Sequence, residues 1–426
     1  MVAMFLHRGN RSVVRYRLLP GFIMLHKNPH PVDDAVSSDG VTISMPMSNR
    51  PIIDRRTFIR GAAGVTLAAA GLAVAGCGPS SPSPSDGVEI PSATANIKPE
   101  PDGDLTWYTW SEYVPPELVA GFEKQYGVKI NQSYFANNAE MLQKMAGGVE
   151  YDLITTNSGF ITQLVAGKLV QAFDINSLRN WGQVKAYFQK PWWDAQSGDG
   201  RYTAPYGYGG TGIFYRTDKI PTVGGWADMW AHPDAAGHIY VLDSMGDSLG
   251  MALLKNGFGM NDGDPANLQK AGSDLLALKS SLASVTQNIT PPVASGEAWL
   301  MEGWATQVYQ GITQMKNPEL ANFFMPPNGP MLACDTLSIG AKAKAPGTAL
   351  LFIDWMLAPE HNHALGAFTL NRTGAAGGDA AFAEAMKTYP YFNFAEDLVN
   401  DRNNWKEYPY GDRLQLWNSQ WSRFTA

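Results

Sequence analysis

The sequence predicts an α/β protein whose central sheet contains parallel strands. Between residues 105 and 173, short runs rich in β-branched and aromatic residues alternate with segments whose apolar residues recur at helical spacing. The same alternation returns between residues 226 and 255 and again between 331 and 357. Strands and helices that alternate at this pitch are typical of sheets whose helices connect parallel strands.

The predicted elements follow one another along the chain from residue 105. The expected strands start at residue 105 and cover 128–134, 151–156, 169–173, 213–215, 238–242, the run ending at 304, and 331–339. The expected helices cover 117–126, 139–146, 160–166, 226–230, 249–255 and 349–357.

Length and charge limit the possible partners. A chain of 426 residues with 45% hydrophobic residues is long enough for two or three domains. Residues 1–76 hold nine Lys/Arg and four Asp/Glu, so the net charge of −7 leaves −12 on the remainder. This acidic body argues against nucleic acid as a partner and is compatible with a cationic ligand.

The N-terminal region predicts export and a lipid anchor. Arg55 and Arg56 form a twin-arginine export signal. The apolar run 61–76 is too short for a stable membrane span and ends in a Val-Ala-Gly-Cys sequence that resembles a lipobox. We therefore expect 45–76 to be a signal peptide, and Cys77 to be the lipidated residue on the outer face of the cytoplasmic membrane.

The segments on either side of this signal predict little structure. Export signals begin close to their basic residues, so we expect 1–44 to be an extension upstream of a true start at Met45 or Met47; an unusually long signal is the alternative. Residues 77–103 are rich in Ser and Pro, which predicts an extended tether before a fold that begins near Asp104.

Polar and aromatic side chains follow two predicted strands of the first half. The carboxyl ends of parallel strands meet at one edge of a sheet, where α/β proteins hold ligands. Carboxylates pair with ammonium groups, and aromatic faces suit both the charge and the methylenes of an organic amine. The sequence thus predicts one wall of a site for an organic cation, formed by Trp110, Ser111, Glu112 and Tyr113 after the first strand and by Asn157 and Ser158 after the third.

Three acids and one tryptophan further along the chain are candidates for the other walls. Asp243 and Asp247 lie at the start of a predicted helix, where each could cap the helix or pair with an ammonium. Trp304 ends an apolar run, where its ring could either form a wall of the site or pack in the core. Asp335 lies inside an apolar strand, where a carboxylate is costly unless it is paired.

Several chemical classes have no signature in the sequence. Gly207, Gly209 and Gly212 match the dinucleotide pattern, but a strand rather than a helix follows them, so we expect a flexible crossover between two lobes instead. Cys334 is expected to be an inert buried thiol. The sequence has only two cysteines, its histidines at 361 and 363 have an unsuitable spacing for a metal site, and it lacks a nucleophile elbow. We therefore expect no metal, no cofactor and no enzyme, and an exported enzyme is the least favoured alternative.

Five strings together resemble the spermidine/putrescine-binding proteins of bacterial ABC importers, over nearly all of 104–426. The most specific is Trp-Ser-Glu-Tyr-Val-Pro-Pro at 110–116; the others lie at 151–153, 226–228, 296–304 and 335–339. The resemblance implies a two-lobed periplasmic-binding-protein fold of the type II kind. Its lobes would be 104–214 with 334–375, and 215–333 with 376–426, and they would close over a ligand.

The resemblance also implies roles for individual residues. Trp110 and Tyr113 would be aromatic walls, and Glu112 would face an amine. Trp304 would stack on the aliphatic chain of the ligand, while Asp335 would pair with an amine. Asp247 matches a Glu of the family on the second lobe. The implied protein is a monomer that captures a polyamine or other small cation and delivers it to an ABC permease and its ATPase.

This chain departs from the family at three positions. Ser244 stands where the family has an Asp, Ala333 where it has a second tryptophan, and Gly159 where it has a tyrosine. These departures leave open an opine, an amino-acid derivative or another small cation as ligand. A signalling or adhesion lipoprotein on the same scaffold is a further alternative. The aromatic segment 408–421 could pack on the second lobe, donate a side chain to the site, or both.

Overall fold

One 11-stranded sheet organises the part of the chain that the structure describes, which is residues 96–426 without 112, 195–198 and 410. Arg55, Arg56, Cys77 and Glu112 lie outside these residues. The computed structural model places strands at β1 Leu105–Thr109, β2 Ile130–Tyr134, β3 Leu153–Asn157, β4 Val170–Gln171, β7 Ala204–Arg216, β8 Ile239–Leu242, β9 Leu282–Thr286, β10 Leu300–Trp304, β11 Ala321–Phe324, β12 Leu332–Gly340 and β13 Arg372–Thr373. A separate pair consists of β5 Phe173–Asp174 and β6 Gly200–Arg201.

Helices occur at or near all six predicted positions, and the described residues contain further helices that the hydrophobic spacing did not predict. Their bounds are α1 Pro116–Tyr126, α2 Asn138–Ala146, α3 Ile161–Ala166, α4 Ala186–Gln189, α5 Met245–Lys255, α6 Pro265–Leu278, α7 Thr290–Ser295, α8 Ala305–Gln314, α9 Pro346–Leu357, α10 Pro359–Thr369, α11 Asp379–Thr388 and α12 Asp412–Thr425. The predicted segment 226–230 is a 3₁₀ helix, and the predicted strand 169–173 divides into β4 and the start of β5.

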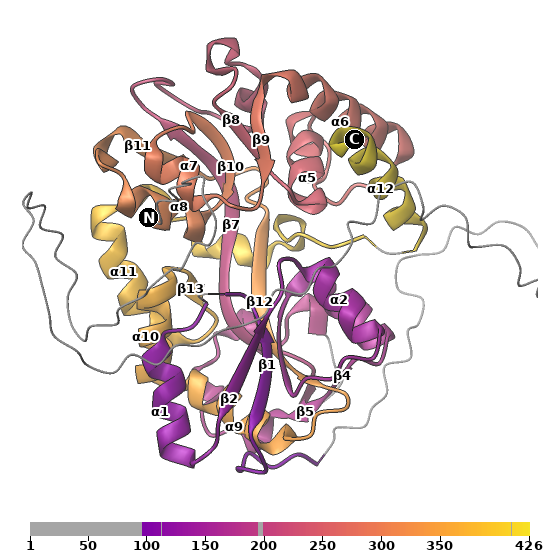
Figure 1. Cartoon of the computed structure of the whole chain (residues 1–426), viewed down its shortest axis with the longest axis vertical. Coiled ribbons are helices and arrows are strands. Elements are labelled where there is room, and N and C mark those ends of the chain that lie inside the picture. Colours follow the sequence, from indigo (N-terminus) through magenta and orange to yellow (C-terminus); the bar gives the residue numbers. More distant parts are fainter. Residues whose placement is uncertain (1–95, 112, 195–198, 410) are drawn as a thin grey trace, which may run out of the picture. The chain divides into compact units, whose positions relative to one another are not determined.

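The sheet has two parallel parts joined by long antiparallel strands. β1 pairs in parallel with β2 and β3, and β8 pairs in parallel with β9 and β10. Between them, β12 runs antiparallel to β3, and β7 runs antiparallel to both β12 and β10. Figure 1 shows β7 and β12 passing from one part to the other. The predicted parallel strands are confirmed within each part. We call the part that contains β1, β2 and β3 the first lobe and the part that contains β8, β9 and β10 the second lobe.

The glycine-rich run 202–215 crosses between the two parts of the sheet as predicted, but as a regular strand rather than a loop. Residues 204–216 form the single strand β7, which crosses between the two parts of the sheet. A Cβ at Gly210 would lie 2.6 Å from the carbonyl oxygen of Pro330, and one at Gly212 would lie 2.6 Å from that of Phe324. These glycines therefore allow backbones to pack closely, and the continuous strand leaves no loop to cradle a phosphate.

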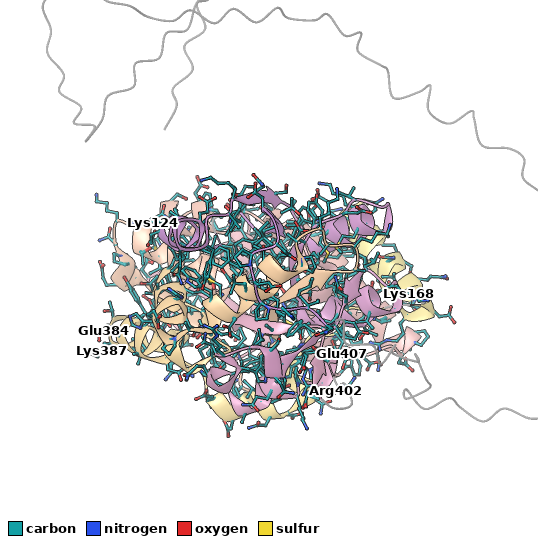
Figure 2. The ribbon with its side chains drawn as sticks, turned by 90° about the horizontal axis from the view of Figure 1, so that it is seen from below. Lys124, Lys168, Glu384, Lys387, Arg402 and Glu407 are labelled. Carbon is teal, nitrogen blue, oxygen red and sulfur yellow. The ribbon has the colours of Figure 1, made fainter. Side chains whose placement is uncertain are left out.

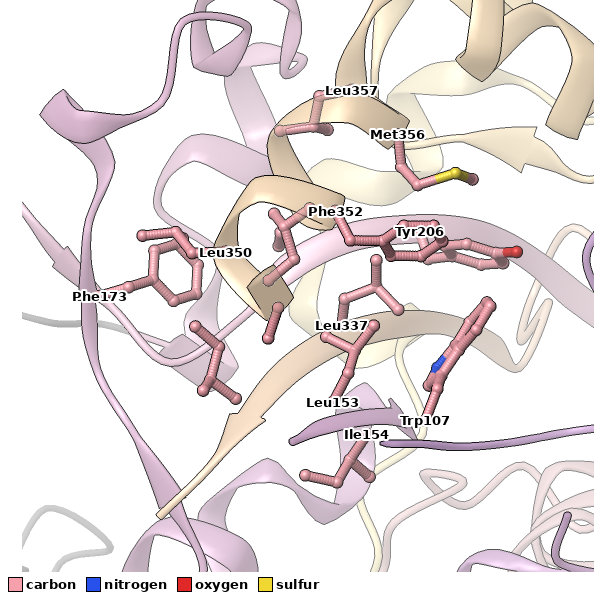
Figure 3. Packing of buried hydrophobic residues seen from close by; sticks show 14 of the residues in the cluster. Trp107, Leu153, Ile154, Phe173, Tyr206, Leu337, Leu350, Phe352, Met356 and Leu357 are labelled. Carbon is pink, nitrogen blue, oxygen red and sulfur yellow. The ribbon is translucent and has the colours of Figure 1, made fainter. Parts of the chain in front are cut away.

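Each lobe has its own apolar core. In the first, Trp107 on β1 lies 5.2 Å from Phe352 on α9 and 6.4 Å from Tyr206 on β7 between ring centroids (Figure 3). The core changes over between Tyr208 and Ile213 along β7 and between Met331 and Leu332 along β12. We propose that the lobes divide near residues 214 and 333, close to these change-overs, whereas the segment 376–426, expected in the second lobe, packs against both.

The chain after residue 376 contributes to both cores. Val399 and Trp405 are buried in the first core, whereas Trp417 and Phe424 of α12 are buried in the second. Helix α12 packs against α6 and α5. Helix α12 therefore packs on the second lobe, which was one of the expected roles of 408–421, whereas Val399 and Trp405 before it pack on the first lobe.

Asp152 joins three elements of the first lobe and provides a test of the fold. One carboxylate oxygen accepts bonds from the backbone N–H and hydroxyl of Thr106 at 2.8 and 2.6 Å, and the other accepts from the N–H groups of Lys344 and Ala345 at 2.6 and 2.9 Å. Every partner is a donor, so the NH₂ of an asparagine would oppose two of them. We expect Asp152→Asn to lower the free energy of unfolding by about 2–3 kcal/mol in urea titrations.

The matched control for this variant is Asp234→Asn, because Asp234 is exposed. A stability loss below about 0.5 kcal/mol for Asp152→Asn would contradict the role of Asp152 as a clamp.

Candidate functional site

The candidate site begins where β1, β3 and β12 meet. Trp107 and Tyr108 of β1 pair with Leu153 and Ile154 of β3, so the segments after these two strands leave the sheet at the same edge. β12 runs antiparallel to β3 and places Asp335 directly opposite Asn157. The predicted convergence of the two strand ends is therefore confirmed, and β12 adds a carboxylate to it.

Asp335 is held by two neutral donors. The hydroxyl of Tyr113 donates to its Oδ2 at 2.6 Å, and the amide of Asn157 donates to its Oδ1 at 3.4 Å. Burial raises the pKa of Asp335, while these hydrogen bonds and the charge of Lys406 oppose the rise. Burial, together with the Asp335 charge, raises the pKa of Tyr113 well above its usual value, so its phenol remains a donor at neutral pH.

Asn371 connects this cluster to the second lobe. Its Nδ2 donates to the Tyr113 hydroxyl at 3.3 Å, and its Oδ1 accepts from the hydroxyl of Thr306 at the start of α8. A pocket with walls that include Tyr208, Tyr309 and Asn371 adjoins the cluster on this side. Asn371 thus contacts a side chain from each lobe.

Asp247 lies in a second cluster and is paired with a lysine. Its Oδ1 accepts from the ammonium of Lys406 at 2.5 Å and from the hydroxyl of Thr211 at 2.6 Å, and its Oδ2 accepts from Ser244 at 2.6 Å. Burial by itself would raise the pKa of Asp247, but the Lys406 charge and these hydrogen bonds bring it below its ordinary value. Asp247 is therefore an ionised carboxylate whose charge is already met by a cation.

Glu302 on β10 is a third acid near Asp247. It is fully buried, and its Oε2 accepts from the N–H of Leu242 at 3.1 Å and from the hydroxyl of Ser248 at 2.8 Å. Its Oε1 has no hydrogen-bond partner among the described residues. Burial and the charge of Asp247 raise the pKa of Glu302 to about 8, so this acid is protonated at neutral pH.

The other predicted site residues lie around these clusters. Trp110 is half-buried against Phe135, with ring centroids 4.3 Å apart. Ser111 and Asp243 are exposed, whereas Ser158 is buried and its hydroxyl accepts from the N–H of Cys334 at 3.2 Å. Trp304 is half-buried beside the smaller core cluster of the second lobe. The structure thus joins Tyr113, Asn157 and Asp335 directly and leaves Asp243 at the surface.

The sequence did not indicate four of the residues that hold these clusters. Thr211, Glu302, Asn371 and Lys406 all act through contacts with residues more than 30 positions away. One signal was available for Asn371, because residues 367–371 (Ala-Phe-Thr-Leu-Asn) align with a Tyr-Pro-Thr-Pro-Asn turn of the family that the sequence resembles. Lys406 lies two residues before the aromatic segment 408–421 and is part of no recognisable motif.

Two general features limit the chemistry of the described residues. No group of three or more His, Cys, Asp or Glu side chains there could hold a metal ion. No helix among them is long and apolar enough to cross a membrane. Cys334 is a buried free thiol whose Sγ lies 3.3 Å from the carbonyl oxygen of Asp335.

Comparison with known proteins identifies the family. The family model described as bacterial extracellular solute-binding protein matches residues 117–407. The chain belongs to this family. Spermidine/putrescine-binding periplasmic protein 1 of Haemophilus influenzae is 28% identical over 338 residues, which are 75% of this chain and 88% of that protein.

One further relative and one solved structure are similar to this chain. The putrescine/cadaverine-binding protein of Pseudomonas aeruginosa is 27% identical over 266 residues, 59% of this chain and 73% of that protein. The solved structure of a putative spermidine/putrescine ABC transporter from Listeria monocytogenes has a TM-score of 0.68 at 23% identity and covers 76% of this chain and 99% of that one. The two-lobed periplasmic-binding-protein fold that the sequence predicts is confirmed, and the family implies a transport component rather than an enzyme.

Proposed function

We propose that this protein is the substrate-binding component of an ABC importer and captures a polyamine of the spermidine/putrescine class between its lobes. The observation that carries the proposal is Asp335, a half-buried carboxylate whose described hydrogen-bond partners, Tyr113 and Asn157, are both neutral. A carboxylate that is partly removed from water gains from a counter-charge, and a ligand ammonium supplies one. The resemblance at 110–116 and the relatives named above support the same ligand class.

The aromatic rings near Asp335 suit the aliphatic part of such a ligand. The ring of Tyr113 lies 5.4 Å from that of Tyr206, and Trp110 lies on the same strand end. Aromatic faces attract both ammonium groups and the methylenes next to them. In this proposal Trp110, Tyr113 and Trp304 flank the carbon chain, while Glu112 and Asp335 face the amines.

Delivery to the membrane forms the second half of the proposal. Export through the twin-arginine signal at Arg55 and Arg56, followed by lipid attachment at Cys77, would hold the folded protein at the outer face of the cytoplasmic membrane. A monomer tethered there would close on its ligand and present it to the permease, which the ATPase drives.

Calorimetric titration with putrescine, cadaverine, spermidine and spermine tests the ligand class. We expect at least one of them to bind with a dissociation constant in the micromolar range or below and to raise the melting temperature. A folded sample that gives no binding heat and no thermal shift with any of the four would refute the polyamine assignment.

A second candidate is an amino-acid-derived cation bound by the same fold. Lys406 favours it, because this ammonium lies in the site and could donate to the carboxylate of such a ligand. Native mass spectrometry of the purified protein separates the two, since a co-purified ligand reveals its mass directly.

A further inference from the structure

The geometry points to Lys406 as a residue that determines specificity. We propose that its ammonium is a built-in substitute for one ammonium of the ligand, so that the site accepts an amine with one positive charge fewer than it would with a neutral residue at position 406. This inference rests on the proposed function and narrows it to short amines such as diamines, in preference to triamines.

Lys406 is fixed in place from the first lobe. The preceding Trp405 is fully buried, donates its Nε1 to the carbonyl oxygen of Val399 at 2.9 Å and stacks on Tyr187 with centroids 5.4 Å apart. The backbone N–H of Lys406 donates to the carbonyl oxygen of Leu332 on β12 at 2.9 Å. The backbone of residue 406 is therefore anchored next to the strand that carries Asp335.

The residues after Lys406 are anchored equally well. The N–H of Tyr408 donates to the carbonyl oxygen of Gly159 at 3.2 Å, and its ring stacks on Phe160 with centroids 4.0 Å apart. A Cβ at Gly159 would lie 3.1 Å from both the Lys406 carbonyl oxygen and the Tyr408 nitrogen. The missing side chain at Gly159 thus provides the space in which residues 406–408 lie.

Asn261 holds the same segment from the second lobe. Its Nδ2 donates to the carbonyl oxygen of Trp405 at 2.8 Å, and its Oδ1 accepts from the N–H of Glu407 at 2.9 Å. Contacts with Leu332 and Gly159 in the first lobe and with Asn261 in the second therefore fix the backbone of residues 405–408. The Lys406 side chain turns to Asp247, and only 15% of it is exposed.

Asp247, the acid of the second lobe, already has its hydrogen bonds and its charge satisfied by residues of this chain. Asp247 receives three donors, one of them a full positive charge, and Lys406 also approaches the hydroxyl of Thr211 at 3.2 Å. The side chain of Asp247 is 6% exposed. A ligand ammonium would have to displace Lys406 and leave a buried lysine without its partner, which is strongly unfavourable.

Counting charges gives the same result. At neutral pH Asp247 is ionised, Glu302 is protonated and Lys406 is positive, so this second cluster carries no net charge. It therefore leaves no acid of its own for a ligand ammonium. With a neutral residue at position 406, Asp247 would attract one ammonium more.

The test compares putrescine and spermidine binding to the wild-type protein, Lys406→Gln and Lys406→Arg by calorimetry. We expect Lys406→Gln to shift the ratio of the two dissociation constants at least tenfold towards spermidine, and Lys406→Arg to keep the wild-type ratio. The matched control is Lys387→Gln, which removes the same charge from a lysine that is 71% exposed and pairs with Glu384 at the surface (Figure 2). This control should leave the ratio unchanged.

A double variant keeps the inference testable if Lys406→Gln does not fold. Asp247→Asn with Lys406→Gln removes the ion pair without changing the net charge, and we expect putrescine affinity within threefold of wild type. A tenfold loss in the double variant would mean that the ligand uses Asp247, and would overturn the inference. An unchanged ratio in folded Lys406→Gln would also overturn it. Failure of every amine to bind both wild type and variants would refute the proposed function as well.

Discussion

Asp335→Asn is expected to weaken amine binding by on the order of a hundredfold, the largest loss from any single substitution in the site. The asparagine keeps the shape of the side chain and can still accept from Tyr113, which donates at 2.6 Å in the wild type. It removes the negative charge that would face the ligand ammonium. Calorimetric titration with the best ligand among the four amines measures the effect.

Two measurements accompany this substitution. Asp397→Asn removes a carboxylate from an exposed position and should bind like the wild type. Melting temperature without ligand should not fall in Asp335→Asn, because burial already disfavours the charged form of this carboxyl. A folded Asp335→Asn protein that binds the amine within threefold of wild type would show that the ligand ammonium lies elsewhere.

The first lobe could be predicted closely from the sequence because its contacts follow from local patterns. Alternation of strand and helix between residues 105 and 173 implies parallel strands, and the ends of parallel strands converge without further information. The segments after β1 and β3 therefore leave the sheet at the same edge as expected, and Tyr113 and Asn157 both contact Asp335 there. Asp335 could be singled out by a different argument, since an acid within an apolar strand requires partners, and Tyr113 and Asn157 are those partners.

The second cluster could not be predicted, because it depends on contacts that no local pattern encodes. Lys406 reaches Asp247 across 159 positions, and Thr211 reaches it across 36 from the middle of β7. The crossover that the glycines around Thr211 predicted is confirmed, but it is a continuous strand, in which these glycines allow the backbones of Pro330 and Phe324 to approach closely. Asp247 lies at the start of a helix, as predicted. The sequence did not indicate that its ion-pair partner would be Lys406 of the same chain.

Glu302 illustrates why burial matters as much as residue type. In the sequence it is one acid in an apolar run before Trp304, and its charge state depends on partners from other elements. Leu242 and Ser248 bind one oxygen, the other is unpartnered among the described residues, and Asp247 lies close enough to disfavour a second negative charge. The protonated form of Glu302 is what allows Lys406 to neutralise Asp247 alone.

Glu302 should make the free energy of unfolding fall as pH rises, whereas an ion-paired acid makes it rise. Its pKa is about 8 in the folded state against an ordinary value of 4.5. Between these two values the folded state keeps a proton that the unfolded chain has lost, so the free energy of unfolding contributed by Glu302 falls as pH rises through this window. Above about pH 8 both states are ionised and the loss is complete.

Glu302→Gln replaces the protonated acid by a neutral side chain of the same shape and should abolish this dependence. We expect the variant to unfold with nearly the wild-type free energy at pH 5 and to be more stable than wild type at pH 9, by on the order of 3 kcal/mol. Urea unfolding of both proteins at several pH values gives the difference, in which the titration of groups common to both cancels. Glu384→Gln, at an exposed glutamate labelled in Figure 2, should show no such divergence. Parallel curves for wild type and Glu302→Gln from pH 5 to 9 would mean that Glu302 is already ionised in the fold, and that Lys406 balances two charges rather than one.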